Sequence, residues 1–206
     1  QALFFLGYNY FELQQEEKGK AYYERLTKEF PDSNYIEEAN FALGEFYFDK
    51  EEWKNALTYY QRISNNKRLR LYGFALYKIS WCLYKSGQVK PALAALEKVI
   101  HTGRVAKGEK DGSAGGVSRI RLATEAIKDL VIFYSEVGTA QGARAYFEEV
   151  AGAKASFGLL EKLAYYYVDT GNREGARVIF RDLIVEKPTA PKAYDYQYQI
   201  VTMFTS

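Results

Sequence analysis

The sequence of 206 residues contains one cysteine, one histidine and four prolines, and these low counts narrow its chemistry. Cys82 has no second cysteine for an intrachain disulfide or for a metal site built from several thiolates. His101 has no second histidine for a zinc site, and no convincing set of nucleophile, base and acid accompanies it. The sequence therefore predicts no catalytic residue, no metal site and no cofactor.

Net charge and long apolar runs are also scarce. The chain has 28 basic and 26 acidic residues, so its formal net charge is only +2. The electrostatic field of so small a net charge is too weak to attract nucleic acid or an anionic membrane. No apolar run reaches the roughly 18 residues that a transmembrane helix needs. The first residue is Gln1, inside an apolar pattern, so we expect a processed or excised chain that leaves room for a targeting segment or anchor upstream.

Helical patterning fills most of the chain. Proline is scarce, and apolar residues recur at helical spacing. Both features indicate an all-α fold. Five small residues recur as anchors, and a second residue lies twelve positions before each. We expect the two members of each pair to face each other where paired helices cross, more loosely at the one bulky position, Val131. The anchors and their partners are Gly19 with Gly7, Ala56 with Gly44, Ala92 with Ser80, Ala143 with Val131, and Ala176 with Ala164.

The stretch ANFALGEFYFDKEEWKNALTYY, residues 39–60, combines Leu43-Gly44, Tyr47, Ala56 and Tyr60 at spacings that resemble the tetratricopeptide repeat. The resemblance covers nearly the whole chain. It implies a single α-solenoid, a right-handed superhelix of antiparallel helix pairs with about five repeats and a partial sixth. The predicted repeats span residues 1–33, 37–70, 73–100, 120–153 and 157–190, with the partial repeat at 191–206. We interpret the Gly-rich, basic residues 101–119 as an inserted loop, in which Arg104, Lys107, Lys110 and Arg119 are solvated.

The turns inside the repeats have their own signals. Gly87, Gly138 and Gly171 each lie five positions before an anchor, where a turn needs a residue that tolerates positive φ. Glu51 holds that place in the second repeat. There we expect a capping box instead, in which Asp49 caps the next helix and Glu52 reaches back.

The first helix of each repeat usually lines the concave face in this family. Carried over by register, that face has carboxylates at positions 12, 38, 45, 49, 125, 136, 161 and 169 but only two lysines, Lys85 and Lys128, and part of it forms the predicted partner-binding surface. We give binding and mutual packing about equal weight for the deepest aromatics, and favour binding for Trp81, Tyr77 and Phe41. The predicted surface comprises Phe4, Tyr8, Phe11, Phe41, Glu45, Phe48, Phe74, Tyr77, Trp81, Tyr84, Lys128 and Tyr165.

An aromatic, acidic face suits a protein or peptide partner with apolar and basic side chains, and it has the wrong charge for nucleic acid. We therefore predict a non-enzymatic protein–protein interaction scaffold. The alternatives are a helical accessory region of a larger enzyme, such as a cell-wall hydrolase, and an RNA-binding repeat, which the acidic face disfavours. Self-association through the apolar face around Tyr198 and Val201 is a further expectation.

One junction is similar to bacterial cell-envelope members of the family: outer-membrane assembly lipoproteins, Tol–Pal partners and gliding-machinery proteins. Pro31, Ser33 and the run Leu43-Gly44-Glu45 carry this likeness. It implies a periplasmic or envelope location, with the cytoplasm as the alternative.

Overall fold

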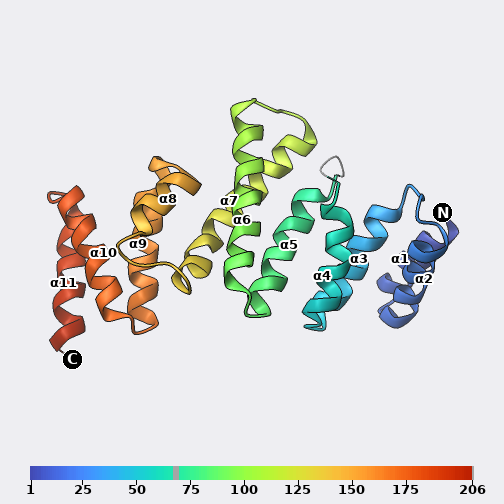
Figure 1. The fold of residues 1–206 in the computed structure, drawn as a ribbon, viewed down its shortest axis with the longest axis horizontal. Helices are drawn as coiled ribbons and strands as arrows, with labels where there is room; N and C mark the ends of the chain where they lie inside the picture. The colour runs from blue at the N-terminus through green and yellow to red at the C-terminus, as the bar shows by residue number, and fades with distance from the viewer. Residues whose placement is uncertain (67–69, 206) are drawn as a thin grey trace. The chain divides into compact units, whose positions relative to one another are not determined.

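A computed structural model describes residues 1–66 and 70–205, and all regular structure in that part of the chain is helical. Residues 67–69, at the end of the predicted second repeat, and Ser206, at the end of the partial sixth, lie outside it. Figure 1 shows helices packed as sequential antiparallel pairs, so the all-α prediction is confirmed. The helices are α1 (Ala2–Glu12), α2 (Glu16–Glu29), α3 (Ile36–Asp49), α4 (Trp53–Ser64), α5 (Tyr72–Lys85), α6 (Val89–Gly108), α7 (Ala114–Ser135), α8 (Ala143–Ala151), α9 (Ala153–Asp169), α10 (Arg173–Glu186) and α11 (Pro191–Thr205).

The chain divides into two compact units, Gln1–Leu122 and Ala123–Ser206. In the first unit each helix from α1 to α6 packs on the next along the chain. In the second unit α8, α9, α10 and α11 pack in the same sequential way. That the two units form one continuous superhelix stays a prediction.

Small residues lie where the paired helices meet, as the repeat spacing predicts. Ala56, Ala92, Ala143 and Ala176 have no exposed surface. An ideal Cβ built on Gly44 would lie 2.5 Å from Cε1 of Tyr60, so only a glycine lets α4 approach α3 this closely.

Four of the repeat turns use a left-handed residue at the same place, five positions before the anchor. Gly87 and Gly171 have φ of 75° and 81°, and Gln14 and Glu51 reach 56° and 59° without being glycine. After Gln14, Glu51 and Gly87, the next residue donates its N–H to a carbonyl in the last turn of the helix, as Glu52 does to Tyr47 O at 2.9 Å.

Two predictions about turns are wrong. No side chain caps the start of α4, where the structure places Glu51 in the left-handed conformation instead of forming a capping box from Asp49 and Glu52. Gly138 does not have a positive φ. This position needs a glycine for space, because a Cβ there would lie 2.2 Å from Cζ of Tyr134.

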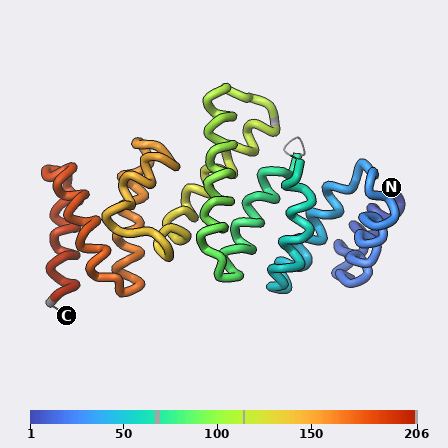
Figure 2. Tube along the Cα trace, viewed as in Figure 1, coloured from blue at the N-terminus to red at the C-terminus, as the bar shows by residue number. Residues whose placement is uncertain are grey.

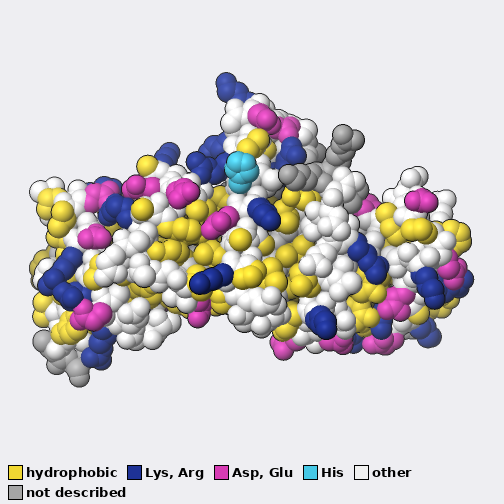
Figure 3. Space-filling model, viewed as in Figure 1, with side chains coloured by type: hydrophobic (Ala, Val, Ile, Leu, Met, Phe, Trp, Pro, Cys, Tyr) yellow, Lys and Arg dark blue, Asp and Glu magenta, His cyan; other side chains and the backbone are white. Residues whose placement is uncertain are grey.

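The predicted loop at residues 101–119 is also wrong. Helix α6 continues to Gly108 and α7 begins at Ala114, so the chain reverses within a short turn between them (Figure 2). The apolar stripe of α6 explains the extension, since buried Gly103 and Ala106 continue the spacing set by Val99 and Ile100. The glycines that suggested a loop are accommodated in the helices and the short turn. His101, in consequence, lies exposed on α6 (Figure 3).

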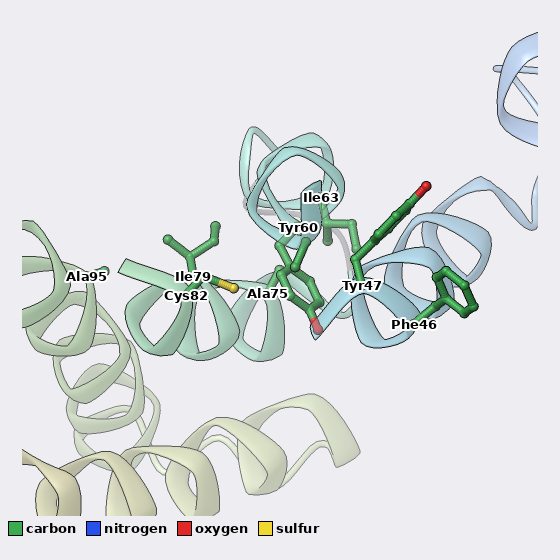
Figure 4. Close-up of a cluster of buried hydrophobic side chains, with 9 residues drawn as sticks. Phe46, Tyr47, Tyr60, Ile63, Ala75, Ile79, Cys82 and Ala95 are labelled. Atoms are coloured by element: carbon green, nitrogen blue, oxygen red, sulfur yellow. The ribbon is translucent and has the colours of Figure 1, made fainter. Parts of the chain in front are cut away.

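A cluster of buried side chains in the first unit joins α3, α4, α5 and α6. Tyr60 of α4 and Cys82 of α5 have no exposed surface, and Ile63 of α4 is almost completely buried (Figure 4). We call this set the shared core: Phe46, Tyr47, Ala56, Tyr60, Ile63, Ala75, Ile79, Cys82 and Ala95. Phe11, Phe41 and Tyr59 pack against it while keeping part of their surface exposed.

Candidate binding surface

A cavity of about 370 Å³ lies beside the shared core in the first unit, and it contains three of the predicted surface residues, Phe11, Phe41 and Glu45. Phe11 comes from α1, and Phe41 and Glu45 from α3, so two neighbouring helix pairs build its walls. We call it the aromatic pocket, defined by Phe11, Glu16, Glu38, Phe41, Ala42, Glu45, Phe46, Asp49 and Leu71.

The side chains of α3 in this pocket share one face of the helix. Positions 38, 41, 42, 45, 46 and 49 recur three and four residues apart, and such positions lie on one side of an α-helix. The same face therefore carries both the aromatic rings and the carboxylates, which is the combination that the register predicts.

Glu45 is fixed by two donors. The hydroxyl of Tyr60 donates to Glu45 Oε1, and Lys78 Nζ donates to Oε2 at 2.9 Å. Burial, followed by the hydrogen bond to Glu45 and its charge, raises the pKa of Tyr60 above its ordinary value of 10.0, so this tyrosine remains a donor at neutral pH. The shared core thus holds one carboxylate of the pocket in place.

Among the described residues, only one of the two carboxylate oxygens of Glu38 has a hydrogen-bond donor. Its Oε1 accepts from Arg70 Nη2 at 2.9 Å, whereas Oε2 is buried without a donor among the described residues. A buried acceptor without a donor is costly. A cationic group supplied by a partner would remove that cost, so Glu38 is the carboxylate with the most to gain from binding.

Cations near the rim offset part of the negative charge. Lys50 lies 3.9 Å from Glu16, and its Nζ lies 4.6 Å from the ring centroid of Phe46. With Lys78 and Arg70, three cations thus accompany the four carboxylates of the pocket. Register alone does not place these three cations on the predicted surface, so sequence reasoning missed them.

Four other predicted aromatics pack against a neighbouring ring. Phe4 stacks on Tyr35 with ring centroids 4.6 Å apart, and Phe48 meets Trp53 edge-on at 5.1 Å. Trp81 and Tyr84 form an edge-on pair at 5.7 Å. For these residues, mutual packing accounts for part of the ring surface that the sequence assigned to a partner.

Tyr8, Phe74 and Tyr77 complete the predicted aromatics of the first unit. Tyr8 is 49% exposed and Phe74 38%, while Tyr77 is half-buried on α5. These three, like the four packed rings above, lie outside the lining of the aromatic pocket.

The last two predicted residues, Lys128 and Tyr165, belong to the second unit. Lys128 is exposed and donates to both oxygens of Glu125 at 2.8 and 2.9 Å. Tyr165 meets Phe180 edge-on at 5.2 Å, and burial raises its pKa. Each is described within its own unit, and their part in one surface with the residues of the first unit stays a prediction.

The described residues also bear on metal binding, on membrane-spanning helices and on the reactivity of Cys82. They contain no group of three or more His, Cys, Asp or Glu side chains placed to hold a metal ion. None of their helices is both long enough and apolar enough to cross a bilayer. Burial raises the pKa of the Cys82 thiol to about 12, which suits a core side chain and not a nucleophile.

Comparison with known proteins supports the repeat assignment over parts of the chain. The comparison with curated proteins finds no match. The chain matches the tetratricopeptide repeat family over two segments. The first is residues 1–33, which contain α1 and α2, and the second is residues 74–102, which contain most of α5 and the first part of α6. This family is a binding repeat and not an enzyme family, and such repeats imply a protein partner.

Proposed function

We propose that the protein is a non-enzymatic scaffold that binds a partner polypeptide at the aromatic pocket. The observation that carries the proposal is the cavity of about 370 Å³, in which Phe11 and Phe41 from neighbouring helix pairs lie beside Glu38. Aromatic side chains in a concave site provide apolar contact area, and a carboxylate beside them selects for a cation.

The partner is a segment with apolar and basic side chains. A lysine or arginine would place its aliphatic stem against Phe41 and Phe11 and bring its charged end to Glu38 and Asp49. An aromatic or aliphatic neighbour would fill the rest of the cavity. The offsetting cations at the rim, Lys50, Lys78 and Arg70, make one or two basic side chains a better match than a long basic run.

Selection of random peptides displayed on phage against the full chain tests this proposal. We expect selected peptides to combine a basic residue with an apolar one. Phe41→Ala should weaken them by at least about tenfold in fluorescence polarisation, since buried aromatic anchors dominate such interfaces. The double variant Glu38→Gln with Asp49→Asn should weaken the same peptides, and more so at low salt.

Matched controls lie in the second unit. Phe204→Ala removes a ring that is 49% exposed on α11, and Asp182→Asn neutralises an exposed carboxylate on α10. Neither should change affinity. Far-UV circular dichroism checks that each variant stays helical. Basic–apolar peptides that bind the Phe41→Ala protein as tightly as the original would overturn the proposal.

We propose that the binding surface extends beyond the aromatic pocket and continues along α5, where Tyr77 and Trp81 lie. The double variant Tyr77→Ala with Trp81→Ala should then weaken long peptides but spare short ones that occupy only the aromatic pocket. Equal loss for both lengths, or no loss for either, would limit the surface to the pocket.

The setting we propose is a bacterial envelope complex. Its support is the likeness of the junction around Pro31 and Ser33 to envelope members of the family. Fractionation of cells that express the full reading frame with a C-terminal tag tests this setting. Recovery of the protein in the cytoplasmic fraction would contradict it.

A further inference from the structure

A second and larger cavity lies on the other side of α3. Its volume is about 740 Å³, and α2, α3 and α4 supply most of its walls. We call it the arginine pocket, defined by Glu24, Thr27, Lys28, Pro31, Ile36, Glu37, Asn40, Tyr59, Arg62 and Ile63.

Helical geometry separates the two pockets. Ile36, Glu37 and Asn40 line the arginine pocket, whereas positions 38, 41, 42, 45, 46 and 49 of the same helix line the aromatic pocket. With about 100° between successive residues, these two sets point to opposite sides of α3. A ligand in one pocket therefore leaves the other accessible.

Arg62 is held in position within this cavity. Its guanidinium carbon lies 4.8 Å from the ring centroid of Tyr59, and Nη1 donates to Asn40 Oδ1 at 3.3 Å. Asn40 is 5% exposed and is itself fixed, because its Nδ2 donates to Ile36 O at 2.8 Å. Tyr59 stacks on Tyr47 with ring centroids 5.5 Å apart. The guanidinium is thus oriented before any ligand arrives.

The two carboxylates of the pocket already have internal partners. Glu24 Oε1 accepts from the hydroxyl of Tyr47 at 3.1 Å and lies 3.7 Å from Lys20 Nζ. Glu37 Oε1 accepts from the backbone N–H of Leu71. The hydrogen bond to Tyr47 raises the pKa of Lys20, and the charge of Glu24 adds to it, so this lysine stays protonated.

The remaining binding capacity is cationic. A guanidinium has five N–H donors, and the one described hydrogen bond of Arg62 uses a single one of them. Lys28 adds a second exposed cation to the lining, and Pro31 and Ile36 add accessible apolar surface. A planar guanidinium held on an aromatic ring recognises carboxylates through paired hydrogen bonds.

We propose that the arginine pocket is a second docking site, which binds an extended segment of a partner protein through an aspartate or glutamate side chain. Arg62 receives the carboxylate, Lys28 supports it, and apolar neighbours of the acidic residue pack on Pro31 and Ile36. The site differs from the aromatic pocket in position and selects the opposite charge, so the protein can hold two segments at once.

The test is selection of random peptides, with both ends held in linkers, against the full chain. Binders are sorted by whether they lose affinity for the Arg62→Glu protein. The Arg62-dependent class should be enriched in Asp or Glu flanked by apolar residues. Arg62→Ala should weaken these peptides by at least about tenfold, the effect of losing a charge-assisted hydrogen bond. Replacing the acidic residue of the peptide by Lys should restore binding to the Arg62→Glu protein.

Arg25→Ala is the matched control, because Arg25 is an exposed arginine of α2 that pairs with Glu29 and is outside the pocket lining. It should change affinity by less than about twofold. Arg62→Lys keeps the charge but loses the planar stack, and it should restore only part of the binding. Thermal melting confirms that the variants are folded.

Failure of this inference differs from failure of the proposed function. Phe41→Ala should leave the acidic class unchanged, and Arg62→Ala should leave the basic class unchanged. The inference is wrong if no Arg62-dependent class emerges, if that class lacks acidic residues, or if Arg25→Ala weakens it as much as Arg62→Ala does.

Discussion

The two faces of α3 carry the same kinds of side chain, but we propose that one binds basic and the other acidic side chains. Each face combines aromatic rings, carboxylates and cations. At the aromatic pocket, Glu38 keeps a buried oxygen without a donor among the described residues. At the arginine pocket, Tyr47 and a backbone N–H occupy the carboxylates, and the guanidinium keeps donors to spare. The comparison teaches that the preference of a surface follows from which side chains are already hydrogen-bonded, and not from a count of its charges.

Both pockets depend on one core. Phe46 belongs to the shared core and lines the aromatic pocket, while Ile63 belongs to the same core and lines the arginine pocket. Changes to the core should therefore affect both pockets together, and changes to one lining should affect one pocket.

Gly44→Val should have the largest effect. Its side chain would start 2.5 Å from Cε1 of Tyr60, and overpacking of this kind costs about 1–3 kcal/mol of unfolding free energy. Peptide binding at both pockets should weaken together. Urea unfolding measures the loss.

Gly158→Ala is the control for this substitution, since no atom lies within 4 Å of a Cβ built there. It should stabilise the protein by up to about 1 kcal/mol through helix propensity. If Gly44→Val lost binding at one pocket and kept the other, the two would not share a core.

Alkaline pH should also destabilise the protein, progressively as the pH rises. Burial raises the pKa of Cys82 from 9.0 to about 12. The unfolded thiol ionises near its ordinary pKa while the folded thiol stays protonated, so this contribution is fully present below pH 9. It is lost as the pH rises toward the folded value, at about 1.4 kcal/mol per pH unit.

Urea unfolding at a series of alkaline pH values measures this slope. Cys82→Ala should reduce it, even though the cavity it creates also lowers stability at neutral pH. Tyr60 contributes in the same direction at higher pH, because burial raises its pKa as well. Equal slopes for the original protein and the Cys82→Ala variant would contradict the assignment.

Asn40→Ala should separate the two faces at a smaller cost. It removes the hydrogen bond to Ile36 O and the acceptor that holds Arg62, with a loss of about 1–2 kcal/mol in unfolding free energy. Acidic peptides should bind more weakly because Arg62 is less well oriented, and basic peptides should be unaffected. Asn55→Ala, at an exposed asparagine of α4, is the control. Equal weakening of both peptide classes would argue that Asn40 acts through stability alone.

Lys50→Gln should have the smallest effect. Lys50 Nζ lies 3.3 Å from Glu17 and 3.9 Å from Glu16, and such exposed pairs contribute less than about 1 kcal/mol. Removal of this cation makes the aromatic pocket more negative, so affinity for basic peptides should rise about twofold at low salt. Binding of acidic peptides should stay constant. A rise for both classes would show that the charge of Lys50 acts beyond its own pocket.

The repeat spacing was readable from the sequence because it reflects a steric requirement. Backbones cross closely only where both side chains are small, so Gly44 and Ala56 had to appear twelve positions apart. The sequence predicts too little helix at α6 and α7 because packing decides where these helices end. Glycine indicates a loop by propensity, but Gly103 is buried in a helix by tertiary packing, which overrides propensity.

The binding surface was only partly predictable. Helical register assigned Phe11, Phe41 and Glu45 to one surface, and all three line the aromatic pocket. Register gave no information about Lys78 or Arg70, whose ion pairs span more than 30 positions of sequence. The arginine pocket was missed because its lining comes mainly from second helices and one junction. The run Tyr59, Arg62 and Ile63, with positions three and four residues apart, was the available signal.

The left-handed residue that closes four of the repeat turns has a kinetic consequence. Gln14, Glu51, Gly87 and Gly171 join helices that are adjacent in sequence, so the contacts they enable require only short chain closures. Chains dominated by such local contacts fold quickly and can begin at any hairpin. Synthesis on the ribosome would therefore let each hairpin form soon after it emerges, without waiting for the rest of the polypeptide.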